Sequence, residues 1–160
     1  MLTTLRARLV ASRDSLEAAA LFLVRLSAGI VFAMSGWGKL HNLPAIIDFF
    51  TELGIPYPSL QAPFVSGLEL VGGLLLIAGL FARLISLPLI GTMVVAMVTA
   101  KASEVEAWHD VLGFIEWHYL AFFAVVALMG PGKLSLDHLL TKKLLEKRAP
   151  VAPVGAALTT

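Results

Sequence analysis

The chain contains no cysteine among its 160 residues, and only 14% of them are charged. Without thiols, this chain can form no disulfides, dithiol redox relays, thiolate metal sites or cysteine-ligated iron–sulfur clusters. The net charge is only +1, and the basic residues gather toward the two ends, so no nucleic-acid partner is expected. Any redox chemistry therefore needs a bound cofactor or a partner protein.

Hydrophobic residues are abundant instead, at 58% of the chain, with a mean hydropathy of +0.86. A transmembrane helix needs about 20 mainly apolar residues to cross about 30 Å of hydrocarbon. Four runs approach that length, at residues 18–40, 62–81, 84–100 and 111–130. The sequence predicts an all-α integral membrane protein, in which residues 18–130 form a four-helix bundle within the lipid bilayer.

Lysine and arginine residues flank the spans unevenly. They lie before the first span, between the second and third at Arg83, and after the fourth from Lys133 onward. The other two loops carry mainly acidic residues, among them Asp48 and Glu104. Because cytoplasmic loops are enriched in Lys and Arg, both termini are predicted to be cytoplasmic.

Four further segments are predicted outside the four spans. Residues 1–17 form a cytoplasmic amphipathic segment, and residues 131–148 form a cytoplasmic amphipathic helix that Ser135 caps. Residues 149–160 contain prolines and small residues without periodicity, which predicts a disordered tail. An apolar helical face between Pro44 and Gly54 predicts a short interfacial helix on the outer surface.

Ionisable residues inside the spans need partners, because a charge at membrane depth costs a few kcal/mol. Lys39 lies on one face of the first span with Gly29 and Gly36, and such small residues allow a close neighbouring helix. Glu69 likewise shares a face of the second span with Gly73. The aliphatic stem of Lys39 can span most of the difference in membrane depth between Lys39 and Glu69. We therefore expect Lys39 and Glu69 to pair, directly or through water.

The fourth span carries a second carboxylate, Glu116. It shares a face with His109, whereas His118 lies about 200° around the helix and therefore points elsewhere. We expect Glu116 to face inward and to converge with Lys39 and Glu69. Two carboxylates near one ammonium suit proton handling or recognition of a polar head group. The alternative is an ion-pair network that only fixes the helix register.

Three other kinds of residue have structural as well as functional interpretations. Arg25 lies near the cytoplasmic end and is expected to snorkel to the surface or to cap carbonyl groups. Trp37 belongs to an expected outer aromatic belt, with stacking on a quinone as the alternative. The histidines lack ligand spacing, so neither a metal nor a haem is expected. No nucleotide-binding fingerprint is visible either.

Five short motifs follow one another along the chain: GWGKL at 36–40, GIPYP at 54–58, ELVGG at 69–73, GLFAR at 79–83 and GPGKLSLD at 130–137. Together they resemble the DoxX family of small bacterial four-helix membrane proteins, over roughly residues 21–139. The resemblance implies a bacterial inner-membrane protein. It also implies that Lys39 and Glu69 are the motif lysine and glutamate, and that Glu116 matches an acidic position in the last span.

The resemblance implies redox partners as well. The family shares its pattern with a subunit of an archaeal thiosulfate:quinone oxidoreductase, and some bacterial members are associated with complexes of thiol and superoxide defence. The absence of cysteine places any sulfur chemistry in another subunit.

Two main functions stay open from the sequence. The first is a membrane subunit of a quinone-linked oxidoreductase, in which Lys39, Glu69, Glu116 and Trp37 surround a quinone head group in the outer half of the bundle. Partner subunits or a second copy of the chain would then complete the complex. The second is a non-catalytic scaffold or assembly partner whose buried charges are structural. A small-molecule transporter is a weaker third alternative, because four unbroken spans leave little room for alternating access.

Overall fold

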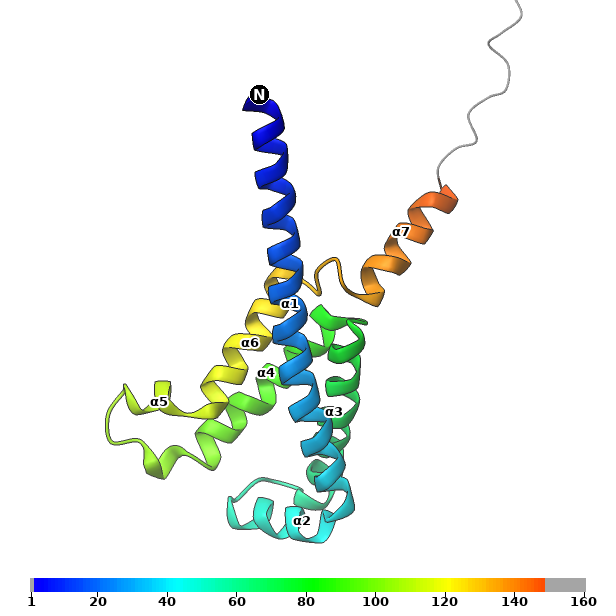
Figure 1. The fold of residues 1–160 in the computed structure, drawn as a ribbon. Coiled ribbons are helices and arrows are strands. Elements are labelled where there is room, and N and C mark those ends of the chain that lie inside the picture. Colours follow the sequence, from blue (N-terminus) through cyan, green and yellow to red (C-terminus); the bar gives the residue numbers. More distant parts are fainter. Residues whose placement is uncertain (1, 149–160) are drawn as a thin grey trace, which may run out of the picture.

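The computed structural model describes the backbone of residues 2–148, and the side chains of residue 13 and residues 15–145 except residue 103. The described residues form helices joined by turns and loops, with no strands, which confirms the predicted all-α fold class (Figure 1). Its elements are α1 (Leu2–His41), α2 (Leu43–Glu52), α3 (Pro58–Ala78), α4 (Ala82–Thr99), the 3-10 helix η1 (Ala102–Glu104), α5 (Asp110–Gly113), α6 (Ile115–Met129) and α7 (Leu136–Arg148). The tail predicted at 149–160 lies outside the described residues.

Three of the described helices are long and apolar enough to cross a membrane: the part of α1 from Ser15 to His41, then α3 and α4. The fourth predicted span differs from the expectation. Phe114 has an extended backbone, with φ −71° and ψ 141°, and it separates the short α5 from α6. α6 therefore has 15 residues and a length of about 22 Å, less than the thickness of the hydrocarbon core.

The helices form two close pairs, α1 with α3 and α4 with α6. The pairs meet around Phe32 of α1, whose ring packs edge-on against Tyr119 at 5.2 Å and Phe123 at 4.8 Å between ring centroids. Figure 1 shows α4 and α6 leaning away from α1 and α3 toward the end that carries α2 and α5. The buried core comprises Ala28, Phe32, Leu76, Ala82, Leu89, Met93, Phe123 and Val126.

Glycines bring the backbones of α1 and α3 into contact. A Cβ atom on Gly36 would lie 2.3 Å from the backbone nitrogen of Leu70, and one on Gly73 would lie 2.4 Å from that of Ala33. No side chain fits at such distances without displacement of a helix. The close helix approach predicted from the glycine faces is therefore confirmed.

The helices outside the bundle also form. α2 lies across the ends of α1 and α3 and has no buried residue, so the short helix predicted between Pro44 and Gly54 forms (Figure 1). α1 continues without a break through residues 2–17. α7 projects from the opposite end, but at about 100° per residue Lys143 lies on the same side as Leu136 and Leu140. Apolar and basic residues are therefore not separated along α7.

Gly36 and Gly38 provide a matched test of the helix contact, because a Cβ atom on Gly38 would meet nothing within 4 Å. Gly36→Ala should lower the free energy of unfolding by about 1–3 kcal/mol, the usual cost of overpacking. Gly38→Ala should leave stability equal or higher, since alanine is the better helix former. Thermal unfolding in detergent, followed by circular dichroism, measures both. Equal effects of the two substitutions would contradict the close contact.

Candidate functional site

Lys39 and Glu69 form an ion pair between α1 and α3. The Lys39 Nζ atom lies 2.6 Å from Glu69 Oε1, and Ser35 Oγ donates a hydrogen bond to Glu69 Oε2 at 3.0 Å. The Glu69 side chain is 4% exposed, whereas that of Lys39 is 31% exposed. The predicted contact is confirmed, and it is direct.

The local sequence explains this geometry. Glu69 lies on the buried face of α3 with Ser66 and Gly73, which is the face that contacts α1. Gly36 lets α3 approach closely, one turn before Lys39. Lys39 lies in the last turn of α1, where the helix dipole favours a cation. Both oxygens of Glu69 are thus satisfied, while Lys39 keeps N–H groups for another acceptor.

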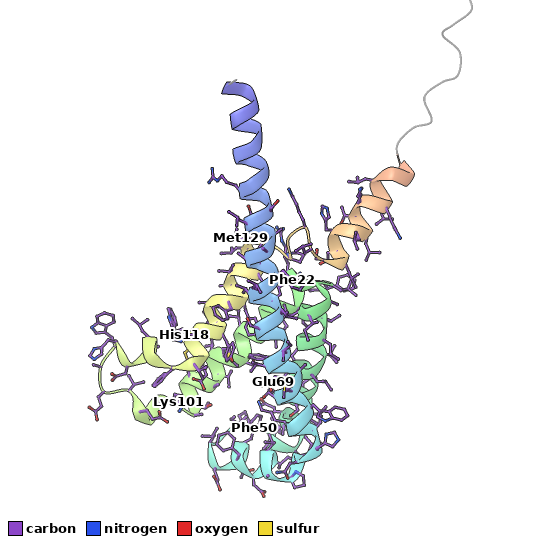
Figure 2. The ribbon with its side chains drawn as sticks, in the orientation of Figure 1. Phe22, Phe50, Glu69, Lys101, His118 and Met129 are labelled. Carbon is purple, nitrogen blue, oxygen red and sulfur yellow. The ribbon has the colours of Figure 1, made fainter. Side chains whose placement is uncertain are left out.

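Glu116 does not join this pair. In the described chain, no hydrogen bond or ion pair links it to Lys39 or Glu69. It lies near Lys101 instead, close enough for their charges to interact. Figure 2 shows Lys101 well apart from Glu69, on the other helix pair. The predicted three-residue cluster is corrected to two clusters, because the α4 and α6 pair leans away and α6 begins only after Phe114.

The second cluster surrounds the Lys101 ammonium. Its Nζ atom lies 2.9 Å and 3.1 Å from the two carboxylate oxygens of Glu104. This hydrogen bonding raises the pKa of Lys101, and the negative charges of Glu104 and Glu116 act in the same direction, against a smaller opposing effect of desolvation. Glu116 Oε2 is buried and has no hydrogen-bond partner.

The remaining candidates lie outside the Lys39 and Glu69 pair. Trp37 is 59% exposed and packs against the ring of His41, with 4.2 Å between ring centroids. His118 is exposed, and its Nδ1 atom lies 2.9 Å from the carbonyl oxygen of Phe114. His109 is also exposed, with Nε2 3.5 Å from an Asp110 oxygen. No group of three metal-ligating side chains occurs among the residues with described side chains.

Arg25 has a structural position at the opposite end of the bundle. Its side chain is 1% exposed, and it donates from Nη1 to the Leu76 carbonyl oxygen at 3.0 Å and from Nη2 to that of Leu134. The predicted capping of carbonyl groups is confirmed. Arg25 therefore links α1 by hydrogen bonds both to the end of α3 and to the segment that leads into α7.

Sequence reasoning missed Asp137 at this same end. Its carboxylate accepts hydrogen bonds from the backbone nitrogens of Phe81 at 3.0 Å and Ala82 at 3.3 Å, and its own nitrogen donates to the Gly79 carbonyl oxygen at 3.1 Å. Phe81 has φ 49°, which is unusual for a bulky residue. The aspartate at the end of the GPGKLSLD motif was the available signal, although only Ser135 was predicted as a cap. Ser135 does cap α7, accepting from the His138 nitrogen at 3.2 Å.

Comparison with known proteins identifies the family. A model of the DoxX family matches residues 20–102, which is more than half of the chain. The chain belongs to the DoxX family. It is 31% identical over 117 residues to "Putative oxidoreductase CatD" of Bacillus subtilis (72% of this chain, 82% of the relative). It is 27% identical over 128 residues to "Inner membrane protein YqjF" of Escherichia coli (80% and 97%). No solved structure matches the chain.

The DoxX match fits the structure. It covers the spanning part of α1 from residue 20, then α2, α3 and α4. It therefore includes Arg25, Lys39 and Glu69, together with Lys101, whereas Glu116 and Asp137 lie beyond it. The apolar helices and the inner-membrane relative together make this protein a DoxX-family protein of the bacterial inner membrane.

Substitution of Asp137 tests whether its carboxylate stabilises the turn between α3 and α4. Asp137→Ala should lower the free energy of unfolding by about 0.5–2 kcal/mol, because two backbone N–H groups lose their acceptor. Asp137→Asn should cost less, since it keeps one acceptor oxygen. Thermal unfolding in detergent measures both, with the exposed Lys142→Ala on the same helix as the control. An Asp137→Ala protein as stable as the control would contradict this role.

Proposed function

We propose that this DoxX protein is the membrane subunit of a quinone-linked oxidoreductase complex, and that Lys39 donates a hydrogen bond to a carbonyl oxygen of the quinone head group. The observation that carries the proposal is that Lys39 is fixed by an ion pair and is still accessible. Its ammonium is held 2.6 Å from the buried Glu69 carboxylate, yet its side chain stays 31% exposed. A fixed donor with free N–H groups, at the last turn of a membrane-spanning helix, suits a lipid-soluble acceptor.

The residues around Lys39 then have separate roles. Glu69 holds the ammonium in place, and Ser35 holds Glu69, so neither carboxylate oxygen is left for the ligand. Lys39 would stabilise the negative charge that develops on a carbonyl oxygen during reduction, since a prepositioned cation costs no reorganisation. A bound quinone would supply the two-electron chemistry that no side chain of this protein provides.

The composition and the relatives support a subunit rather than an independent enzyme. The chain has no cysteine, so electrons would reach the quinone from a partner protein. One relative, from Bacillus subtilis, carries the name of an oxidoreductase. We therefore expect an oxidoreductase partner subunit, and we do not expect catalysis by this chain alone.

A non-catalytic scaffold is the second candidate function, and one observation favours it. Both oxygens of Glu69, and both terminal nitrogens of Arg25, already have partners within the protein. Buried charges satisfied in this way can serve only to fix helix register. Under this hypothesis Lys39 is simply the exposed half of a structural ion pair.

Quinone binding by purified protein separates the two functions. Lys39→Met should weaken the binding of a short-chain quinone about tenfold, because a hydrogen bond from a charged donor is worth about 1.5–3 kcal/mol. Lys39→Arg keeps a cationic donor and should bind more tightly than Lys39→Met. Titration calorimetry in detergent measures binding, and the exposed Lys142→Met is the matched control.

Stability is recorded alongside binding, because Lys39→Met also leaves Glu69 without its cation. Glu69→Gln preserves shape and hydrogen bonding, so it should weaken binding through the position of Lys39 while the thermal midpoint changes little. Absence of quinone binding by the wild-type protein would overturn the quinone function and favour the scaffold.

The orientation in the membrane is a further proposal, with both termini in the cytoplasm. The absence of natural cysteine makes the test direct, since single cysteines can be introduced without background labelling. A membrane-impermeant maleimide applied to spheroplasts should label Asp48→Cys in α2 but not Lys142→Cys in α7 until the membrane is permeabilised. Labelling of Lys142→Cys in intact spheroplasts would reverse the orientation.

A further inference from the structure

A second polar cluster lies at the end of the bundle that carries α5. It consists of Lys101, Glu104 and Glu116, with the ring of Phe114 beside them. Lys101 holds both oxygens of Glu104, and its Nζ atom lies 5.8 Å from the centre of the Phe114 ring. Figure 2 shows Lys101 at the end of α4, below His118 of α6. Neither proposed function uses this cluster.

Glu116 is the unsatisfied member of this cluster. Its Oε2 atom is buried and accepts no hydrogen bond. A carboxylate oxygen in that state is costly, because burial removes water without supplying another donor. Lys101 lies near enough to interact with Glu116 electrostatically, but its hydrogen bonds go to Glu104. With one ammonium and two carboxylates, the cluster lacks one positively charged hydrogen-bond donor.

The surroundings indicate what kind of molecule would bring that donor. The cluster lies where α4 ends and α6 begins, which is the depth of lipid head groups for helices of this length. Exposed apolar side chains flank it on both helices, with Val98 67% exposed and Ile115 61% exposed. These positions suit the hydrocarbon part of an amphiphile.

We propose that Glu116 and Lys101 form a binding site for a zwitterionic phospholipid whose head group ends in a primary ammonium. The ammonium donates to Glu116 Oε2, and the lipid phosphate lies against the Lys101 ammonium. Both charges of the head group then meet their opposites. Glu104 occupies two of the three N–H donors of Lys101, which leaves one donor for the phosphate. A simple monovalent cation would satisfy Glu116 but would leave that donor unused, and a choline head group has no N–H to donate. The site is independent of the quinone proposal.

Lipid competition on the full chain tests the site. The purified protein is mixed with equal amounts of phosphatidylethanolamine and phosphatidylcholine of identical acyl chains, and bound lipid is counted by native mass spectrometry. The wild-type protein should prefer phosphatidylethanolamine about tenfold, as one charge-assisted hydrogen bond predicts. Glu116→Gln should lose this preference. Glu106→Gln, which changes an exposed acid between η1 and α5, should keep it.

A second measurement needs no variant, in case Glu116→Gln does not fold. Stepwise N-methylation of the head group keeps its charge and removes its N–H donors, so wild-type affinity should fall along the series. Equal affinity for the first and last members would overturn the proposal, as would an equal loss in Glu106→Gln. If millimolar free ethanolamine abolishes the preference, the site recognises a soluble amine and the assignment to a lipid is wrong.

Discussion

The backbone contact between α1 and α3 is the constraint on which the rest of the structure depends. Gly36 and Gly73 allow it, because neither position has room for a Cβ atom. At that separation the Lys39 ammonium reaches Glu69 directly at 2.6 Å, near one end of the bundle. Toward the other end, the same contact brings Arg25 to the Leu76 carbonyl oxygen. One helix pair thus positions both Arg25 and Lys39 of α1.

The charged groups of this protein differ in how completely the protein satisfies them. Both oxygens of Glu69 are bonded, and Arg25 uses both terminal nitrogens, although its buried Nε atom has no hydrogen-bond partner. Lys39 is fixed but stays partly exposed, and Glu116 keeps a buried oxygen without a partner. Because an unmet buried polar atom is costly, ligands are best sought where the protein leaves such atoms. By that criterion Glu116 Oε2 suits a cationic donor. Lys39 is a candidate on different grounds, because it is partly exposed and keeps N–H groups for a neutral acceptor.

Much of the fold could be predicted because the membrane makes local patterns informative. Apolar runs mark the helices, and a charge in a glycine-rich stripe must face another helix. The Lys39 and Glu69 contact therefore followed from helical periodicity together with the similar depth of the two residues. The prediction for Glu116 went further than periodicity allows. The residue that Glu116 meets depends on the helix break at Phe114 and on the tilt of α4 and α6 away from α1 and α3. Both are set by packing. Asp137 was missed because its partners lie 55 and 56 positions away.

The sequence by itself determined the membrane location, the helical class, the family and the α1 face on which Gly29, Gly36 and Lys39 lie. These follow from composition, from residue spacing along one helix and from short motifs, which are properties of neighbouring residues. Only the tertiary structure decided which carboxylate meets which lysine. Helix crossing and tilt decide that pairing, and they depend on contacts such as Phe32 against Phe123, residues far apart in the chain. The protein therefore has two polar clusters where periodicity predicted one.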